Sequence, residues 1–164
     1  MILRQASKKK WLKLARIDHG IIGAAIAAAP VFWVVAYLYW QAPFDSAPFN
    51  PMWPLSDPKR FLFLVFIIPV IEELCFRGVI QPYLLQKTSK RYLYHQVSLA
   101  NLVTSTLFAS LHLVKHPPAW SAATFLPSLI FGWLRERTGK TWPAVTMHVY
   151  YNFGYFYLLS GIFE

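Results

Sequence analysis

The sequence predicts an all-α membrane protein, a bundle of about five transmembrane helices. Of its 164 residues, 56% are hydrophobic and only 14% are charged, whereas about a quarter of the residues are charged in a typical soluble domain. The apolar residues form long runs, and the basic residues fall in short clusters between them. Such clusters anchor and orient membrane helices, so the net charge of +9 does not predict a nucleic-acid partner. We expect a basic cytoplasmic arm at residues 1–16, followed by one transmembrane domain at residues 17–164.

The first predicted helix is the uncharged run at residues 20–40, which is long enough to span about 30 Å of hydrocarbon. A secretory signal has a shorter apolar core, so we expect this helix to be retained. Pro30 should kink it. The next segment, residues 41–58, contains five prolines and predicts a loop outside the bilayer.

Four further apolar runs complete the predicted bundle, at residues 61–85, 97–113, 120–134 and 142–163. With the N-terminus inside, the inner segments hold six, three and three of the sixteen lysines and arginines, and the outer segments hold three. Cytoplasmic loops of membrane proteins carry an excess of basic residues. This asymmetry therefore predicts a multi-pass protein of the cell membrane with a cytoplasmic N-terminus and an outer C-terminus.

Charged side chains interrupt the second apolar run at Glu72, Glu73 and Arg77. A charge at the centre of a membrane helix costs about 2.5–3.5 kcal/mol on insertion scales, so these groups should be paired, hydrated or functional. Glu73 and Arg77 are four residues apart with the acid first, which favours an ion pair on one helical face. Glu72 lies about 100° round the helix from Glu73 and has no such partner, which leaves it available for chemistry.

Three polar residues of the later runs are further candidates, namely His112, His148 and Asn152. Taken singly, each has a structural explanation, because a histidine at a helix end can face water and an intramembrane polar group can bond a neighbouring helix. Taken with Glu72, they supply a carboxylate that can accept a proton from water, an imidazole that can position the water and two donors for an oxyanion. His148 and Asn152, four residues apart, share one helical face. This inventory suits hydrolysis of a peptide bond by an activated water molecule.

Other kinds of site find less support in the sequence. Cys75 is the single cysteine, so neither an intrachain disulfide nor a thiolate metal cluster can form. Gly-x-Ser-x-Gly is absent, and so is His-Glu-x-x-His, the motif of the usual helical zinc proteases. A zinc site made of Glu72, His112 and His148 remains a chemical alternative.

The charged and polar candidates fall into three ordered motifs: Glu-Glu-x-x-x-Arg at residues 72–77, Phe-x-x-x-His at 108–112 and His-x-x-x-Asn at 148–152. This ordered triple on successive membrane helices resembles the CPBP family, which comprises the CAAX prenyl endopeptidases and the bacteriocin-processing and related bacterial intramembrane proteases, often called glutamic-type. Residues 132–143 also resemble the loop before that family's last motif. The resemblance covers about residues 61–156.

The resemblance implies that Glu72 activates water with His112 as its partner, and that His148 and Asn152 form the oxyanion hole. Glu73 and Arg77 would support them. It implies a metal-independent endopeptidase without a cofactor that cleaves near the C-terminus of a membrane-anchored or lipidated protein. The tail could be prenylated, a sorting signal or a bacteriocin leader. The alternatives are a zinc metallopeptidase and a non-enzymatic immunity or scaffold protein of the same fold.

The predicted spans raise one geometric difficulty. At about 1.5 Å per residue along upright helices, Glu72 falls near mid-membrane, His112 near the outer end and His148 nearer the inner end. A tilt, a kink at Pro69 or a water-filled cavity would be needed to bring these side chains to one site.

Overall fold

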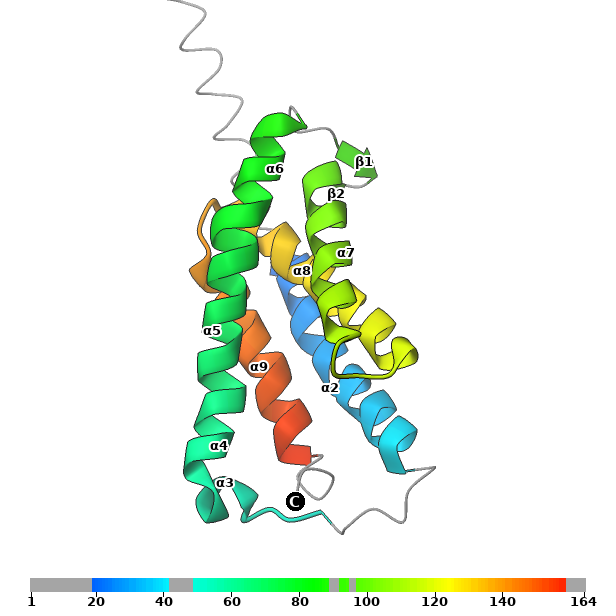
Figure 1. Ribbon diagram of the computed structural model, residues 1–164, viewed down its shortest axis with the longest axis vertical. Helices are drawn as coiled ribbons and strands as arrows, with labels where there is room; N and C mark the ends of the chain where they lie inside the picture. The colour runs from blue at the N-terminus through cyan, green and yellow to red at the C-terminus, as the bar shows by residue number, and fades with distance from the viewer. Residues whose placement is uncertain (1–18, 42–48, 89–91, 95–96, 159–164) are drawn as a thin grey trace, which may run out of the picture.

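Five helical segments lie side by side and run alternately up and down (Figure 1). The computed structural model describes residues 19–41, 49–88, 92–94 and 97–158. The segments are α2 (His19–Gln41), a continuous helical rod at residues 58–87, α7 (Leu99–His112), α8 (Pro118–Thr138) and α9 (Trp142–Leu158). The prediction of a helical protein is confirmed. The predicted arm at residues 1–16 lies outside the described part of the chain.

The rod at residues 58–87 alternates between α-helical and π-helical stretches. It consists of α4 (Pro58–Leu62), η1 (Phe63–Ile67), α5 (Ile68–Glu73), η2 (Leu74–Ile80) and α6 (Gln81–Lys87), where η denotes a π-helix. Each π-helical stretch ends just before a helical turn that contains a proline, Pro69 in α5 and Pro82 in α6. A proline has no N–H to donate, and its ring collides with the carbonyl four residues earlier. A wider π turn lies just before each proline, so the helical backbone continues through Pro69 and Pro82.

Polar residues gather inside the bundle and large apolar residues face outward. Among the described residues, eight polar or charged residues are each 0% exposed: Glu73, Arg77, Gln81, Ser98, Asn101, Thr104, Ser105 and Ser128. Large exposed side chains include Leu62, Ile67, Val79, Leu107 and Leu126, all at least 46% exposed. Among the described residues, one helix, Gly20–Tyr39 in α2, has by itself the length and apolar composition needed to cross a membrane.

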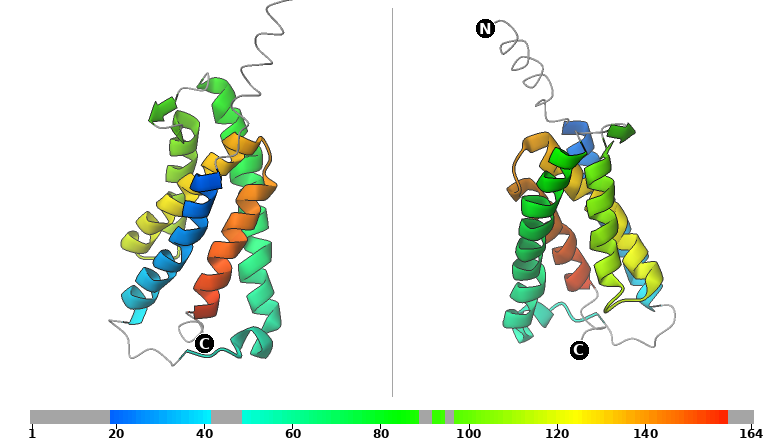
Figure 2. Two further views of the ribbon diagram at one scale, coloured as in Figure 1. Left: turned by 180° about the vertical axis from the view of Figure 1, so that it is seen from behind. Right: turned by 45° about the horizontal axis from the view of Figure 1, so that its top comes forward.

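Close helix contacts depend on glycine at two places. A Cβ on Gly132 of α8 would lie 1.9 Å from Oδ1 of Asn101 on α7, and a Cβ on Gly154 of α9 would lie 2.1 Å from the Trp33 ring of α2. These contacts let α7 approach α8 and let α2 approach α9. Figure 2 shows α2 beside α8 and α9 on the face opposite to the rod. The indole of Trp33 also donates to the Tyr151 carbonyl at 2.9 Å, which ties α2 to α9.

Several predicted boundaries were wrong. The segment at residues 41–58 was expected to be a loop, yet it contains the short helix α3 (Trp53–Ser56), because the Trp53 side chain is buried against Phe61. The basic loop after the rod contains an antiparallel pair, β1 (Tyr92–Tyr94) with β2 (Val97–Ser98), where continuous loop was expected.

The lengths of the last three helices also differ from the predicted spans. Helix α7 has 14 residues, a length of about 21 Å, because Ser98 belongs to β2 and caps α7 by accepting from the Asn101 backbone N–H. Helix α8 is longer than the predicted 120–134 and ends at Thr138. The next residue, Gly139, caps the helix with a φ of 68°, the left-handed conformation that glycine adopts readily. Helix α9 ends at Leu158, and the remainder of the predicted span lies outside the described residues.

Candidate active site

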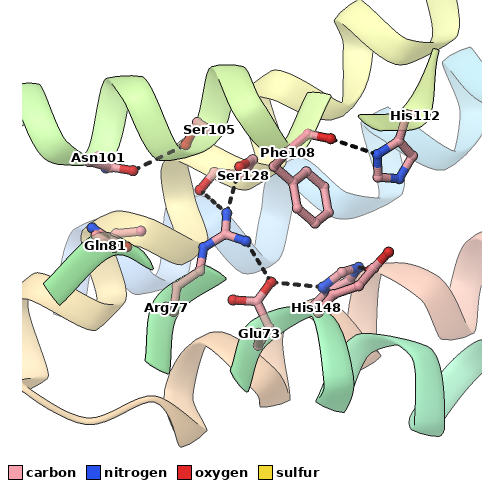
Figure 3. Close-up of polar contacts among 11 residues, drawn as sticks. Glu73, Arg77, Gln81, Asn101, Ser105, Phe108, His112, Ser128 and His148 are labelled. Atoms are coloured by element: carbon pink, nitrogen blue, oxygen red, sulfur yellow. Dashed lines mark hydrogen bonds and ion pairs between the residues drawn. The ribbon is translucent and has the colours of Figure 1, made fainter. Parts of the chain in front are cut away.

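An ion pair between Glu73 and Arg77 lies at the centre of the bundle (Figure 3). Nη1 of Arg77 donates to Oε1 of Glu73 at 3.0 Å, and both side chains are 0% exposed. The sequence spacing predicted this pair, and the structure confirms it. Two opposite charges four residues apart on the rod thus neutralise one another where water is excluded.

A second helix and three aromatic rings complete the surroundings of Arg77. Nη2 donates to both the carbonyl and the hydroxyl of Ser128 on α8, at 2.9 and 2.5 Å. The guanidinium lies 4.9 Å from the ring centre of Phe108, 5.7 Å from that of Phe131 and 5.8 Å from that of Phe76. At such distances a cation is attracted to the face of a ring. Because Arg77 is held on several sides, the position of Glu73 is fixed as well.

His148 of α9 connects the two glutamates. Its Nδ1 lies 2.9 Å from Oε1 of Glu73, and its Nε2 lies 3.6 Å from Oε2 of Glu72. A carboxylate can only accept a hydrogen bond, so Nδ1 carries the hydrogen and Nε2 is the atom presented to Glu72. The imidazole stacks on Phe131 with 4.8 Å between ring centres. This packing and the Glu73 bond set both the orientation and the tautomer of the ring.

Glu72 differs from its neighbour in its surroundings. Its side chain is 28% exposed and lines a cavity of about 490 Å³, whereas Glu73 faces the packed interior. The rotation of about 100° between adjacent residues therefore directs one carboxylate to the Arg77 pair and the other to the cavity. His112, His148 and Asn152 line the same cavity.

His112 is held at the C-terminal end of α7. Its Nδ1–H donates to the Phe108 carbonyl at 2.9 Å, and its ring packs 4.7 Å from the Phe108 ring. Figure 3 shows both side chains near His148. Within the described part of the chain, Glu72 makes no direct hydrogen bond or ion pair with His112, and its imidazole neighbour is His148. The two side chains expected to act as partners thus line one cavity without direct contact.

Asn152 is engaged by a neighbouring helix. Its amide nitrogen donates to the Leu64 carbonyl in η1 at 3.2 Å, so one of its two N–H groups is used within the bundle. The other N–H remains for a further acceptor. In the π-helical stretch η1, the backbone carbonyls accept from other N–H groups along the rod than they would in an α-helix. The sequence spacing did not indicate this feature.

The cavity brings together residues that the predicted spans placed at different depths. Helix α7 ends at His112 after 14 residues, and Figure 1 shows that the end of α7 stops short of the far end of the rod at α4. The cavity is lined from the middle of the rod, the end of α7, the first half of α8 and the second half of α9. The predicted end of this span, residue 113, agrees with the structure to within one residue.

Sequence reasoning missed the residues of α8 that hold the rod. Ser128, Gly132 and Glu136 are spaced by four, and they meet Arg77 and Gln81 of the rod: Nε2 of Gln81 donates to the Gly132 carbonyl at 3.0 Å and to Glu136 at 2.7 Å. The hydroxyl of Ser98 also donates to Glu136. The sequence did contain a pattern that indicates this contact. Small and polar residues recur at intervals of four on α8, and Arg77 and Gln81 have the same spacing on the rod.

The zinc alternative lacks a matching arrangement of ligands. Among the described residues, no group of three or more histidine, cysteine, aspartate or glutamate side chains is placed to hold a metal ion. Nδ1 of His148 is bonded to Glu73, and Nδ1 of His112 to a backbone carbonyl. On these two histidines, the ring nitrogens left to bind a metal are the two Nε2 atoms.

Comparison with known proteins identifies the family. The model of the Rce1-like family, described as type II CAAX prenyl endopeptidase Rce1-like, matches residues 54–154, which is more than half of the chain and includes all six candidate residues. No curated protein and no solved structure matches the chain significantly. The match supports a protease of the CAAX type. The chain belongs to the Rce1-like family of type II CAAX prenyl endopeptidases.

Proposed function

We propose that this protein is a multi-pass membrane endopeptidase that hydrolyses a peptide bond with water activated by Glu72. The observation that carries the proposal is the difference between the two adjacent acids. Glu73 is fully buried and paired, whereas Glu72 reaches the cavity with a carboxylate that has no hydrogen bond among the described residues. An available carboxylate beside a cavity is the group that a general base requires.

His112 would share the attacking water with Glu72. Its Nδ1–H is bonded to Phe108, which leaves Nε2 as an acceptor in the neutral ring. A water molecule that donates one hydrogen to Glu72 and the other to Nε2 would be fixed by both. The gap between the two side chains supports this role, because a direct bond between them would leave no room for the water.

The reaction would then proceed in two proton transfers. Glu72 takes a proton from the water, the resulting hydroxide adds to the carbonyl carbon, and the carbonyl oxygen becomes an oxyanion. The second N–H of Asn152 and, in its protonated form, Nε2–H of His148 would stabilise that oxyanion. The intermediate collapses, the C–N bond breaks, and Glu72 returns its proton to the departing amine.

The membrane setting is proposed from the distribution of side chains. Buried polar groups and outward-facing Leu, Ile and Val are the arrangement expected when the surroundings are lipid. The helices alternate in direction, so the start of α2 and the end of α9 lie at opposite ends of the bundle (Figure 1). This supports termini on opposite sides of the membrane, and the basic residues at 1–16 favour a cytoplasmic N-terminus with an outer C-terminus. The substrate would be presented from the membrane as a lipidated C-terminal tail.

One variant and one treatment of the wild-type protein test the mechanism. We expect purified Glu72→Gln protein in liposomes to leave a prenylated CAAX peptide uncut, because the amide keeps the shape but cannot take a proton. The wild-type protein should keep its activity after treatment with a strong chelator that is then removed. If chelation abolishes cleavage and zinc restores it, the metal alternative is correct. If Glu72→Gln cleaves at the wild-type rate, Glu72 is not the base.

A further inference from the structure

The cavity carries one charged side chain that the proposed reaction does not use. Lys115 lines it from the turn between α7 and α8. Among the described residues that line the cavity, Lys115 is the one lysine or arginine, and Glu72 is the one carboxylate. Water activation and oxyanion stabilisation require no second cation. Lys115 is thus available to bind an anionic part of the substrate.

The turn ties the backbone of Lys115 to that of His112. The backbone N–H of Lys115 donates to the His112 carbonyl at 3.2 Å, and that of His116 donates to the same carbonyl at 2.9 Å. Lys115 therefore follows directly after a side chain that lines the cavity together with Glu72.

The neighbouring histidine does not compete as a cation. The His116 ring stacks against that of His112 with 5.9 Å between centres. Burial, and then the nearby charges of His112 and Lys115, lower the pKa of His116, which favours the neutral form of this ring. The lasting positive charge of the turn therefore belongs to Lys115.

We propose that Lys115 binds the C-terminal carboxylate of the substrate, on the leaving-group side of the bond that is cleaved. The inference rests on the proposed endopeptidase function and adds a rule of specificity to it. An aliphatic tail has one group that is always negative, its terminal carboxylate, and an ammonium is a compact charge suited to it. The aromatic wall of the cavity, which includes Trp120 and Tyr155, suits the apolar side chains before that end. The enzyme would thereby cleave a substrate with a free C-terminal acid faster than the same substrate with a C-terminal amide.

Two peptides and three variants test this assignment on the full-length protein in liposomes. The peptides are one prenylated CAAX sequence with a free C-terminal acid and the same sequence as a C-terminal amide. We expect wild-type kcat/KM to be about 10-fold higher for the acid, the size expected for one charge-assisted hydrogen bond. Lys115→Gln should lose that advantage and leave the amide rate within about twofold of wild type. Lys115→Arg should keep part of it, and Lys140→Gln, outside the cavity, should behave as wild type.

The outcomes separate this inference from the proposed function. If wild-type protein cleaves the acid and the amide peptide equally, or if Lys115→Gln keeps the preference for the acid, Lys115 does not bind the carboxylate. Glu72-dependent cleavage of both peptides would still leave the proposed function intact. If the wild-type protein cleaves neither peptide, the proposed function and this inference both fail.

Discussion

Removing the buried carboxylate of Glu73 should destabilise the fold far more than removing its neighbour Glu72. Glu73 accepts two charge-assisted hydrogen bonds, from Arg77 at 3.0 Å and from His148 at 2.9 Å, and it is 0% exposed. Breaking a buried pair by removing one partner costs about 3–5 kcal/mol, because the other charge stays buried and unmatched. By the scaling for soluble domains of this size, each kcal/mol lowers Tm by about 2–4 °C. We therefore expect Glu73→Ala to lower Tm by about 10 °C or more.

Glu72→Ala provides the matched control. The Glu72 side chain is 28% exposed, and its contact with His148 is 3.6 Å long, which is beyond hydrogen-bond distance. A partly exposed pair contributes about 0–1 kcal/mol, so Tm should fall by no more than about 4 °C. Thermal unfolding in detergent, followed by the loss of monodisperse protein on size exclusion, measures both variants against wild type.

A double variant tests the cause of the loss. Replacing both members of a buried pair with apolar residues is often neutral, so Glu73→Leu with Arg77→Met should recover part of the stability that Glu73→Ala loses. Equal Tm losses for Glu72→Ala and Glu73→Ala, or a double variant no more stable than Glu73→Ala, would refute the division of roles between the two acids.

Three further predictions follow from the site and the packing. Asn152→Ala should lower kcat by about 10²–10³ at similar KM, because one oxyanion donor is lost; an unchanged kcat would mean that the oxyanion is held elsewhere. Gly132→Ala should cost about 1–3 kcal/mol by overpacking, since its Cβ would meet Asn101, whereas Gly23→Ala, with nothing within 4 Å of the new Cβ, should not destabilise; equal Tm values would contradict the close-approach argument. A reporter fused after Glu164 should report the outer side of the membrane, and a cytoplasmic signal would remove the proposed orientation.

Features that depend on local geometry were predictable from the sequence. The pairing of Glu73 with Arg77 requires only that residues four apart share a helical face, and the structure contains that pair. The apolar runs gave the positions of the helices, since their lengths and hydropathy reflect the surroundings of each segment. The ordered motifs indicated the family correctly, because they fall within the region that the family model matches.

Features that depend on packing were not predictable in the same way. Hydropathy does not reveal that Val97 and Ser98 form β2 rather than the first residues of α7, although the predicted end of this span at residue 113 lies within one residue of the observed end. Nor does it reveal that Asn152 bonds the Leu64 carbonyl, since that bond requires α9 to pack against the π-helical stretch η1. The Asn152 bond joins segments far apart in the chain, which local periodicity does not encode.

The arrangement of the site follows from one repeated contact between the rod and α8. Arg77 meets Ser128, and Gln81 meets the Gly132 carbonyl, so the same offset of 51 residues recurs one helical turn later and fixes the register of the two helices. That register holds Arg77, Arg77 holds Glu73, and Glu73 orients the imidazole of His148. Glu72, one residue away, is left facing the cavity. Glu72, the proposed base, is therefore available because its neighbour Glu73 is firmly bound. A loss of the α8 contacts should change the orientation of His148 before it changes that of Glu72.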